Sequence, residues 1–189
     1  MDAVFWIIIA IVAVVVVVVL AGWSYARSRR RRGLEDQFGP EYDRTIGEAG
    51  SRRKAERELS ERERAHDDLH IRPLSETARA RYLEHWRRAE QRFVDDPELA
   101  AREADSIVRG VLDEKGYSGD DFDSRARAVS VDHPSVVARY RHGHEMVHGN
   151  GARGEARTER LRKAMVDFRA VFEELAERDG DRATELAER

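Results

Sequence analysis

Cysteine is absent from this 189-residue chain, and lysine is scarce, because only three of the 34 basic residues are Lys. Without a thiol the protein forms no disulfide and carries no lipoprotein acylation, and cysteine chemistry of every kind is excluded. A glycine-rich phosphate-binding loop is also missing. Outside the N-terminus no stretch alternates polar and apolar residues, so we expect no β-strands. The dominance of Arg over Lys is typical of a GC-rich bacterial genome.

Long apolar runs are missing too, with one exception at the N-terminus. Residues 4–23 contain no charge, and thirteen of these twenty residues are Val, Ile or Leu. At about 1.5 Å per residue, a helix of this length spans roughly 30 Å, the thickness of the bilayer core. Unpaired backbone groups cost several kcal/mol in lipid, so a lone segment there must be helical. Residues 1–33 are therefore predicted to form a transmembrane anchor with a basic collar.

Residues that favour a membrane interface flank this run. They are Trp6, Trp23 and Tyr25, followed by the collar of Arg27, Arg29, Arg30, Arg31 and Arg32. Basic residues remain on the cytoplasmic side, which predicts a single-pass membrane protein with its N-terminus outside and its C-terminal domain in the cytoplasm. A secretory signal peptide begins with basic residues, and none precedes the apolar run, so we expect an anchor that is not cleaved.

The rest of the chain is mildly acidic. Residues 1–33 carry +4 and the whole chain −3, which leaves −7 on residues 34–189. A net negative domain is unsuited to general binding of nucleic acid, whose phosphates require a positive surface.

Residues 34–72 are predicted to form a charged spacer helix. Sixteen of the 28 residues from 41 to 68 are charged, with opposite charges often four apart, as on a solvated helix. The few apolar residues do not sustain a heptad, so a single helix fits better than a coiled coil. On a solvated helix, replacing Leu59 by Ala would cost little stability.

Residues 73–178 are predicted to fold as a compact bundle of four to five helices, which makes the chain all-α, and 179–189 as a flexible tail. Helix starts are indicated at Ser75, Asp96, Asp121, Pro134 and Thr158. Apolar residues recur at steps of three and four, as on helix faces that pack into a core. The predicted core comprises Tyr82, Trp86, Phe93, Ile107, Val111, Val137, Tyr140, Leu161, Met165, Phe168 and Phe172.

One motif suggests chemistry. Residues 144–148 read H-E-x-x-H, which on a helix places His144 and His148 one turn apart to share a zinc ion, with Glu145 as the base. However, the extended motif has Gly154 where the third ligand should stand, and His142 lies about 200° around the helix. With no third ligand apparent, we expect no metal here. A His-rich helix C-terminus, favoured by the helix dipole, is the simpler interpretation.

Five short runs resemble a family of bacterial proteins, found mainly in high-GC genomes. They are F-G-P-E-Y-D-R at 38–44, I-R-P-L at 71–74, R-F-V-D at 92–95, V-D-H at 131–133 and G-E-A at 154–156. The resemblance covers nearly all of the chain after the anchor. It implies a small single-pass or secreted-looking protein of an uncharacterised family, and it supplies no catalytic residues.

The order of these segments indicates a function class. An anchor, a basic collar, a spacer and an acidic bundle would hold a binding surface away from the bilayer. We therefore expect a cytoplasmic-facing interaction or scaffold module that binds the lipid bilayer and a protein partner, is not an enzyme and needs no cofactor. The alternative is a zinc-dependent hydrolase that uses His144, Glu145 and His148.

Overall fold

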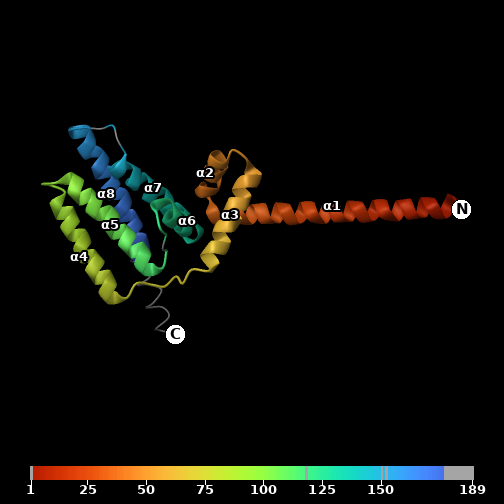
Figure 1. Ribbon diagram of the computed structural model, residues 1–189, viewed down its shortest axis with the longest axis horizontal. Helices are drawn as coiled ribbons and strands as arrows, with labels where there is room; N and C mark the ends of the chain where they lie inside the picture. Colours follow the sequence, from red (N-terminus) through yellow and green to blue (C-terminus); the bar gives the residue numbers. More distant parts are fainter. Residues whose placement is uncertain (1, 118, 150, 152, 177–189) are drawn as a thin grey trace.

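The protein is all-α. The computed structural model describes residues 2–117, 119–149, 151 and 153–176, and their side chains except those of residues 2–14, 26 and 27. These residues form eight helices and no strand. Figure 1 shows a long first helix that projects away from the other seven, which gather at its C-terminal end. The tail predicted at 179–189 lies outside the described residues.

Five helices form the bundle. They are α4 (Glu76–Arg92), α5 (Pro97–Lys115), α6 (Phe122–Asp132), α7 (Pro134–His148) and α8 (Glu155–Ala176). Helix α8 packs along both α7 and α5, and α4 lies on the outer side of α5 (Figure 1).

Side-chain caps start several of these helices where the sequence predicts them. Ser75 Oγ accepts a hydrogen bond from the backbone N–H of Ala78, Asp96 Oδ1 from Leu99, and Asp121 Oδ1 from Ser124. Each bond satisfies a backbone donor that the first turn leaves unpaired. The start predicted at Thr158 is wrong, because α8 begins three residues earlier at Glu155.

The core of the bundle contains the apolar residues that the helical spacing predicts. Nine of the eleven are buried, whereas Tyr82 and Phe93 are partly buried and pack against the same core. The indole of Trp86 stacks on the ring of Phe172 with centroids 5.4 Å apart, which joins α4 to α8.

The predicted spacer helix is wrong. Residues 34–72 contain the end of α1 (Asp2–Phe38), then α2 (Pro40–Ala49) and α3 (Arg52–Asp67). Gly50 ends α2 in the left-handed region at φ 64°, where other residues are strained, and the chain reverses so that α3 packs on α2. This antiparallel pair also contacts α6 and α7, so it is part of the folded domain (Figure 1).

A second apolar cluster explains why the spacer prediction failed. Leu34, Phe38, Tyr42 and Leu59 are buried together with Val131 of α6. These residues are sparse along a highly charged sequence, and they come from four different helices. Their common face exists only after the chain has folded back, so no single helix shows an apolar stripe.

The first helix leaves the domain as an isolated rod. Leu34 and Phe38 at its C-terminal end are buried, whereas Val15–Val19 and Leu20 are about half to two-thirds exposed. Within the portion of the chain that the structure describes, no helix is both long enough and apolar enough to cross a membrane. Side chains 2–14, which include the whole first half of the predicted span, lie outside that portion.

Replacing Trp86 by Ala should destabilise the protein by about 3–5 kcal/mol, because the indole is buried and its removal leaves a cavity against Phe172. Chemical denaturation of both proteins measures the difference in the free energy of unfolding. Val94→Ala, at a side chain that is 84% exposed, is the control and should change it little. Equal stabilities of the Trp86 variant and the parent would contradict the core assignment.

Leu59→Ala should cost about 2–5 kcal/mol, because this side chain is fully buried in the second cluster. This loss of stability is much larger than the one expected for Leu59 on a solvated helix. The matched control is Leu99→Ala, at a leucine that is 41% exposed. If both leucine variants unfold at the same denaturant concentration, the packing of α3 on the bundle is wrong.

Candidate functional site

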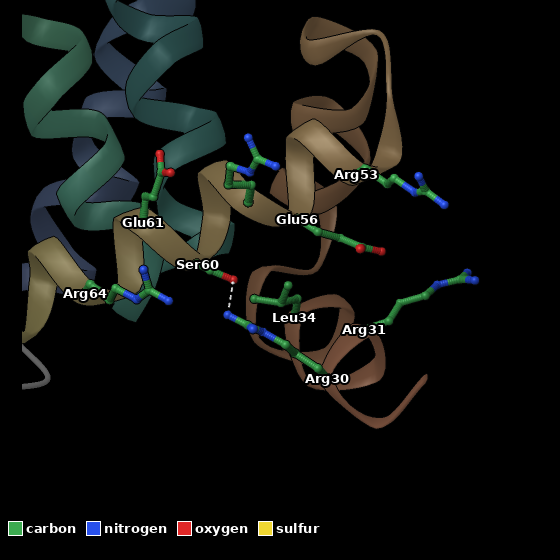
Figure 2. Close-up of a pocket in the computed structure, with 9 residues that line it drawn as sticks. Arg30, Arg31, Leu34, Arg53, Glu56, Ser60, Glu61 and Arg64 are labelled. Carbon is green, nitrogen blue, oxygen red and sulfur yellow. Dashed lines mark hydrogen bonds between the residues drawn. The ribbon is translucent and has the colours of Figure 1, made fainter. Parts of the chain in front are cut away.

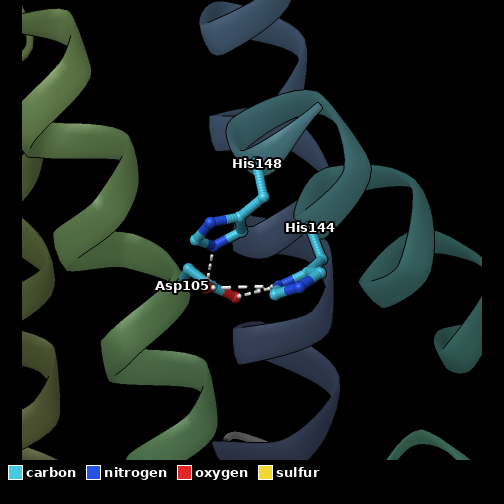
Figure 3. Close-up of side chains that lie close together, drawn as sticks. All are labelled: Asp105, His144 and His148. Atoms are coloured by element: carbon cyan, nitrogen blue, oxygen red, sulfur yellow. Dashed lines mark hydrogen bonds and ion pairs between the residues drawn. The ribbon is translucent and has the colours of Figure 1, made fainter. Parts of the chain in front are cut away.

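The H-E-x-x-H helix faces an aspartate of α5. Helix α7 places His144 and His148 one turn apart, and both rings point at Asp105 (Figure 3). His148 Nε2 lies 2.9 Å from Asp105 Oδ2, and His144 Nδ1 lies 3.3 Å from Asp105 Oδ1. One carboxylate therefore binds two imidazoles from a neighbouring helix.

The cluster lies at the edge of the core. The side chain of Asp105 is 15% exposed, that of His144 28% and that of His148 50%. Burial by itself raises the pKa of the Asp105 carboxyl, but the hydrogen bonds with His144 and His148 outweigh it and hold that pKa below its usual range. The carboxylate is therefore charged at neutral pH.

The ring of His144 is held from a second side. It stacks on Phe122 of α6, with centroids 3.7 Å apart and planes 9° apart. The His148 ring lies next to it, with centroids 4.2 Å apart. The aromatic face on one side and the carboxylate on the other restrict the orientation of His144.

The sequence reasoning missed Asp105, and with it the third possible ligand. The premise that no such residue exists is wrong. A signal was present, because Asp105 lies four residues after Ala101 and three before Val108, both of which are fully buried. An acid at that helical spacing must face or border the core.

His142, as expected, points elsewhere and pairs with Asp167 of α8. Glu145 is exposed.

A second polar cluster surrounds the buried carboxylate of Glu41, in the F-G-P-E-Y-D-R run. Its Oε1 accepts hydrogen bonds from Arg62 at 3.0 Å, Arg141 at 3.1 Å and Arg44 at 3.2 Å. The Glu41 side chain is only 1% exposed. This cluster accounts for Arg141, an otherwise unexpected charge on α7, and joins α2, α3 and α7. Burial lowers the pKa of Arg141, and the attraction of Glu41 opposes that effect.

The same run directs the chain into this cluster. Gly39 has φ 46°, so the chain turns sharply after α1, and Pro40 occupies the first turn of α2. Phe38 and Tyr42 on either side are buried. The run therefore has a structural role at the junction between α1 and the domain.

A basic groove lies where α1 meets α3. It encloses about 500 Å³. Figure 2 shows Arg30 reaching from α1 to Ser60 of α3, where Nη2 donates to Oγ at 3.0 Å. Its lining contains five arginines and two acids: Arg30, Arg31, Arg53, Arg57, Arg64, Glu56 and Glu61. The groove is therefore positively charged.

The predicted membrane-interface residues are only partly described. The side chains of Trp6 and Arg27 lie outside the described part, while Trp23 and Tyr25 are 64% and 71% exposed. Arg29, Arg30 and Arg32 are exposed, and Arg31 pairs with Glu35 one turn along α1 at 2.9 Å.

The comparisons give no relative for this chain: no family model, no curated protein and no solved structure matches it. The resemblance to a bacterial family stays a prediction.

Glu41→Gln should destabilise the protein by about 3–5 kcal/mol, because it removes the buried charge that three arginines share. The second partners of these arginines, Glu48, Glu58 and Asp123, are more exposed carboxylates and do not join the three helices in the same way. The control is Asp43→Asn, at an exposed acid of the same helix. Denaturant titration of both variants against the parent provides the comparison. A Glu41 variant no less stable than the Asp43 variant would show that this cluster does not hold the domain together.

Glu98 should make the stability of the protein fall on acidification. Its hydrogen bonds with Arg157, at 2.6 and 2.9 Å, lower its pKa, and Arg157 in turn binds the carbonyls of Met146 and Val147 at the end of α7. The pKa of Glu98 is lower in the folded protein than in the unfolded chain. The contribution of the Glu98–Arg157 pair to the free energy of unfolding is therefore fully present above the unfolded pKa of about 4.3, and it is lost as the pH falls through the pKa of the folded protein.

The difference in unfolding free energy between parent and Glu98→Gln should therefore be present at pH 6 and shrink on acidification. Asp95→Asn, at an exposed acid, is the control. A difference that grows as the pH falls would have the wrong sign for this assignment.

Proposed function

We propose that this protein is a single-pass membrane protein whose folded domain is an interaction or scaffold module on the cytoplasmic side. One observation carries the proposal: the apolar residues 15–20 of α1 stand exposed on a helix that projects alone from the domain (Figure 1). Exposed aliphatic side chains in such a row need an apolar environment to cover them. The twenty uncharged residues 4–23 have the length that a bilayer requires.

The charges at the base of α1 support the orientation. Arg29–Arg32 follow the apolar run directly, and the basic groove between α1 and α3 adds Arg53, Arg57 and Arg64 to the same region (Figure 2). Anionic headgroups on the cytoplasmic leaflet attract such clusters by about 1 kcal/mol per basic residue near the surface. These arginines favour a cytoplasmic domain that lies close to the headgroups.

The rigid junction supports a scaffold role. The end of α1 packs with α2 and α3, and these helices contact α6 and α7. The bundle is therefore held at one distance and one angle from α1, rather than on a flexible tether. A fixed geometry of this kind suits a surface that must meet a protein partner beside the membrane.

The zinc hydrolase alternative has less support. It requires Glu145 to act as base on a metal-bound water. The ligand atoms that converge come from Asp105, His144 and His148, while Glu145 is exposed. We therefore propose a binding module with no catalytic role.

Membrane insertion can be tested with two arginines in α1. The full-length protein should resist extraction by carbonate, be released by detergent and show a cytoplasmic C-terminus in reporter fusions. Thirteen aliphatic residues contribute about −4 to −8 kcal/mol to insertion, and each central Arg costs about 2.5–3.5 kcal/mol. Val15→Arg with Val16→Arg should therefore release the protein into the soluble fraction.

The control is Val94→Arg, which places an arginine on an exposed valine of the domain and should leave the protein in the membrane. An active C-terminal reporter on the outer side, or a parent protein extracted by carbonate, would refute the anchor and its orientation.

A further inference from the structure

Three potential metal ligands converge between α5 and α7. One atom each from Asp105, His144 and His148 lies within 4.8 Å of the other two (Figure 3). Ligand atoms bound to one tetrahedral ion at about 2.0–2.2 Å lie roughly 3.3–3.6 Å apart. The distances from Asp105 to the two imidazoles, 2.9 and 3.3 Å, are already close to that spacing. Small side-chain rotations would make room for an ion.

We propose that Asp105, His144 and His148 form a site for a divalent transition metal, with zinc as the best-suited ion. Two imidazole nitrogens and one carboxylate oxygen are ligands that Zn²⁺ prefers, whereas Mg²⁺ and Ca²⁺ require more oxygen ligands. The site uses both histidines of the H-E-x-x-H motif, but its third ligand comes from another helix.

The ligands are held by rigid elements. Asp105 lies in the middle of α5, and both histidines lie in the last turns of α7, so backbone helices fix all three. Phe122 stacks on His144 and limits the rotation of its ring. Arg157 binds two carbonyls at the end of α7 and ties that end to Glu98 of α5. Such preorganisation lowers the cost of ordering ligands when an ion binds.

An ion can reach this site from solvent. His148 is half exposed, and it lines a pocket of about 710 Å³ together with Arg102, Arg153 and Arg157. Three protein ligands leave a fourth position for water or an anion. Glu98 in the same lining pairs with Arg157, so Arg102 and Arg153 are the basic side chains that favour an anionic fourth ligand.

The ion would link α5 to α7 in the folded domain. This is independent of the membrane anchor, because neither helix contributes to the apolar segment. The site can therefore be tested whether or not α1 spans a bilayer.

The test uses the tag-free full-length protein in detergent, first stripped of metal by a chelator and then titrated with ZnCl₂ by calorimetry. We expect one Zn²⁺ per chain and a higher melting temperature with zinc, since an ion that binds the folded state stabilises it. Asp105→Asn and His148→Ala should each weaken zinc affinity at least about tenfold. Co²⁺ in place of zinc should give the visible absorption of a four-coordinate site, and His148→Ala should abolish it.

Two matched controls separate this site from surface binding. His142→Ala removes a histidine of the same helix that faces Asp167, and Glu145→Gln removes the acid of the motif, so both should bind zinc like the parent. Circular dichroism verifies that each variant is folded. If Asp105→Asn does not fold, the result for His148→Ala, at a half-exposed side chain, decides the outcome. No stoichiometric binding in the parent, binding unchanged in His148→Ala, or equal loss in His142→Ala would overturn the assignment.

Discussion

A single carboxylate oxygen, Glu41 Oε1, binds three arginines from α2, α3 and α7, and the arrangement of the whole molecule depends on this cluster. It fixes how the α2–α3 pair sits on the bundle. Because α1 runs into that pair through the turn at Gly39, the cluster also sets the direction in which α1 leaves the domain. Together with the apolar cluster beside it, the Glu41 cluster determines how α1 is oriented relative to the bundle.

The free energy of this junction comes mainly from its apolar residues. Fully burying Phe38 and Leu59 contributes about 1.5–3 kcal/mol each. A buried ion cluster gains little net stability, because the desolvation of its charges offsets their attraction. Its value lies in specificity: a shifted packing of α3 would leave Glu41 or an arginine buried without a partner, which costs several kcal/mol. The apolar cluster therefore drives docking, and the charges select one geometry.

Helix α7 connects the two ends of the domain. Arg141 contacts the Glu41 cluster, and His144 and His148 one and two turns later contact Asp105. At the far end, Arg157 holds the last carbonyls of α7 against Glu98. Restraint at these three points gives α7 a fixed position between the α2–α3 pair and α5. The polar residues that look anomalous on an apolar bundle helix thus each have a partner on another element.

The sequence by itself determined the helical class, most helix starts and nine of the buried residues of the bundle core, because caps and the 3.6-residue period act within a few residues. It also indicated the apolar N-terminal run, which needs only composition. It could not determine that residues 40–67 fold back on the bundle, since Tyr42, Leu59 and Val131 are far apart along the chain and share a face only in the folded state. The tertiary structure alone placed Asp105 beside His144 and His148 and paired Glu41 with Arg141 a hundred residues away, because such contacts depend on how helices pack and not on any local pattern.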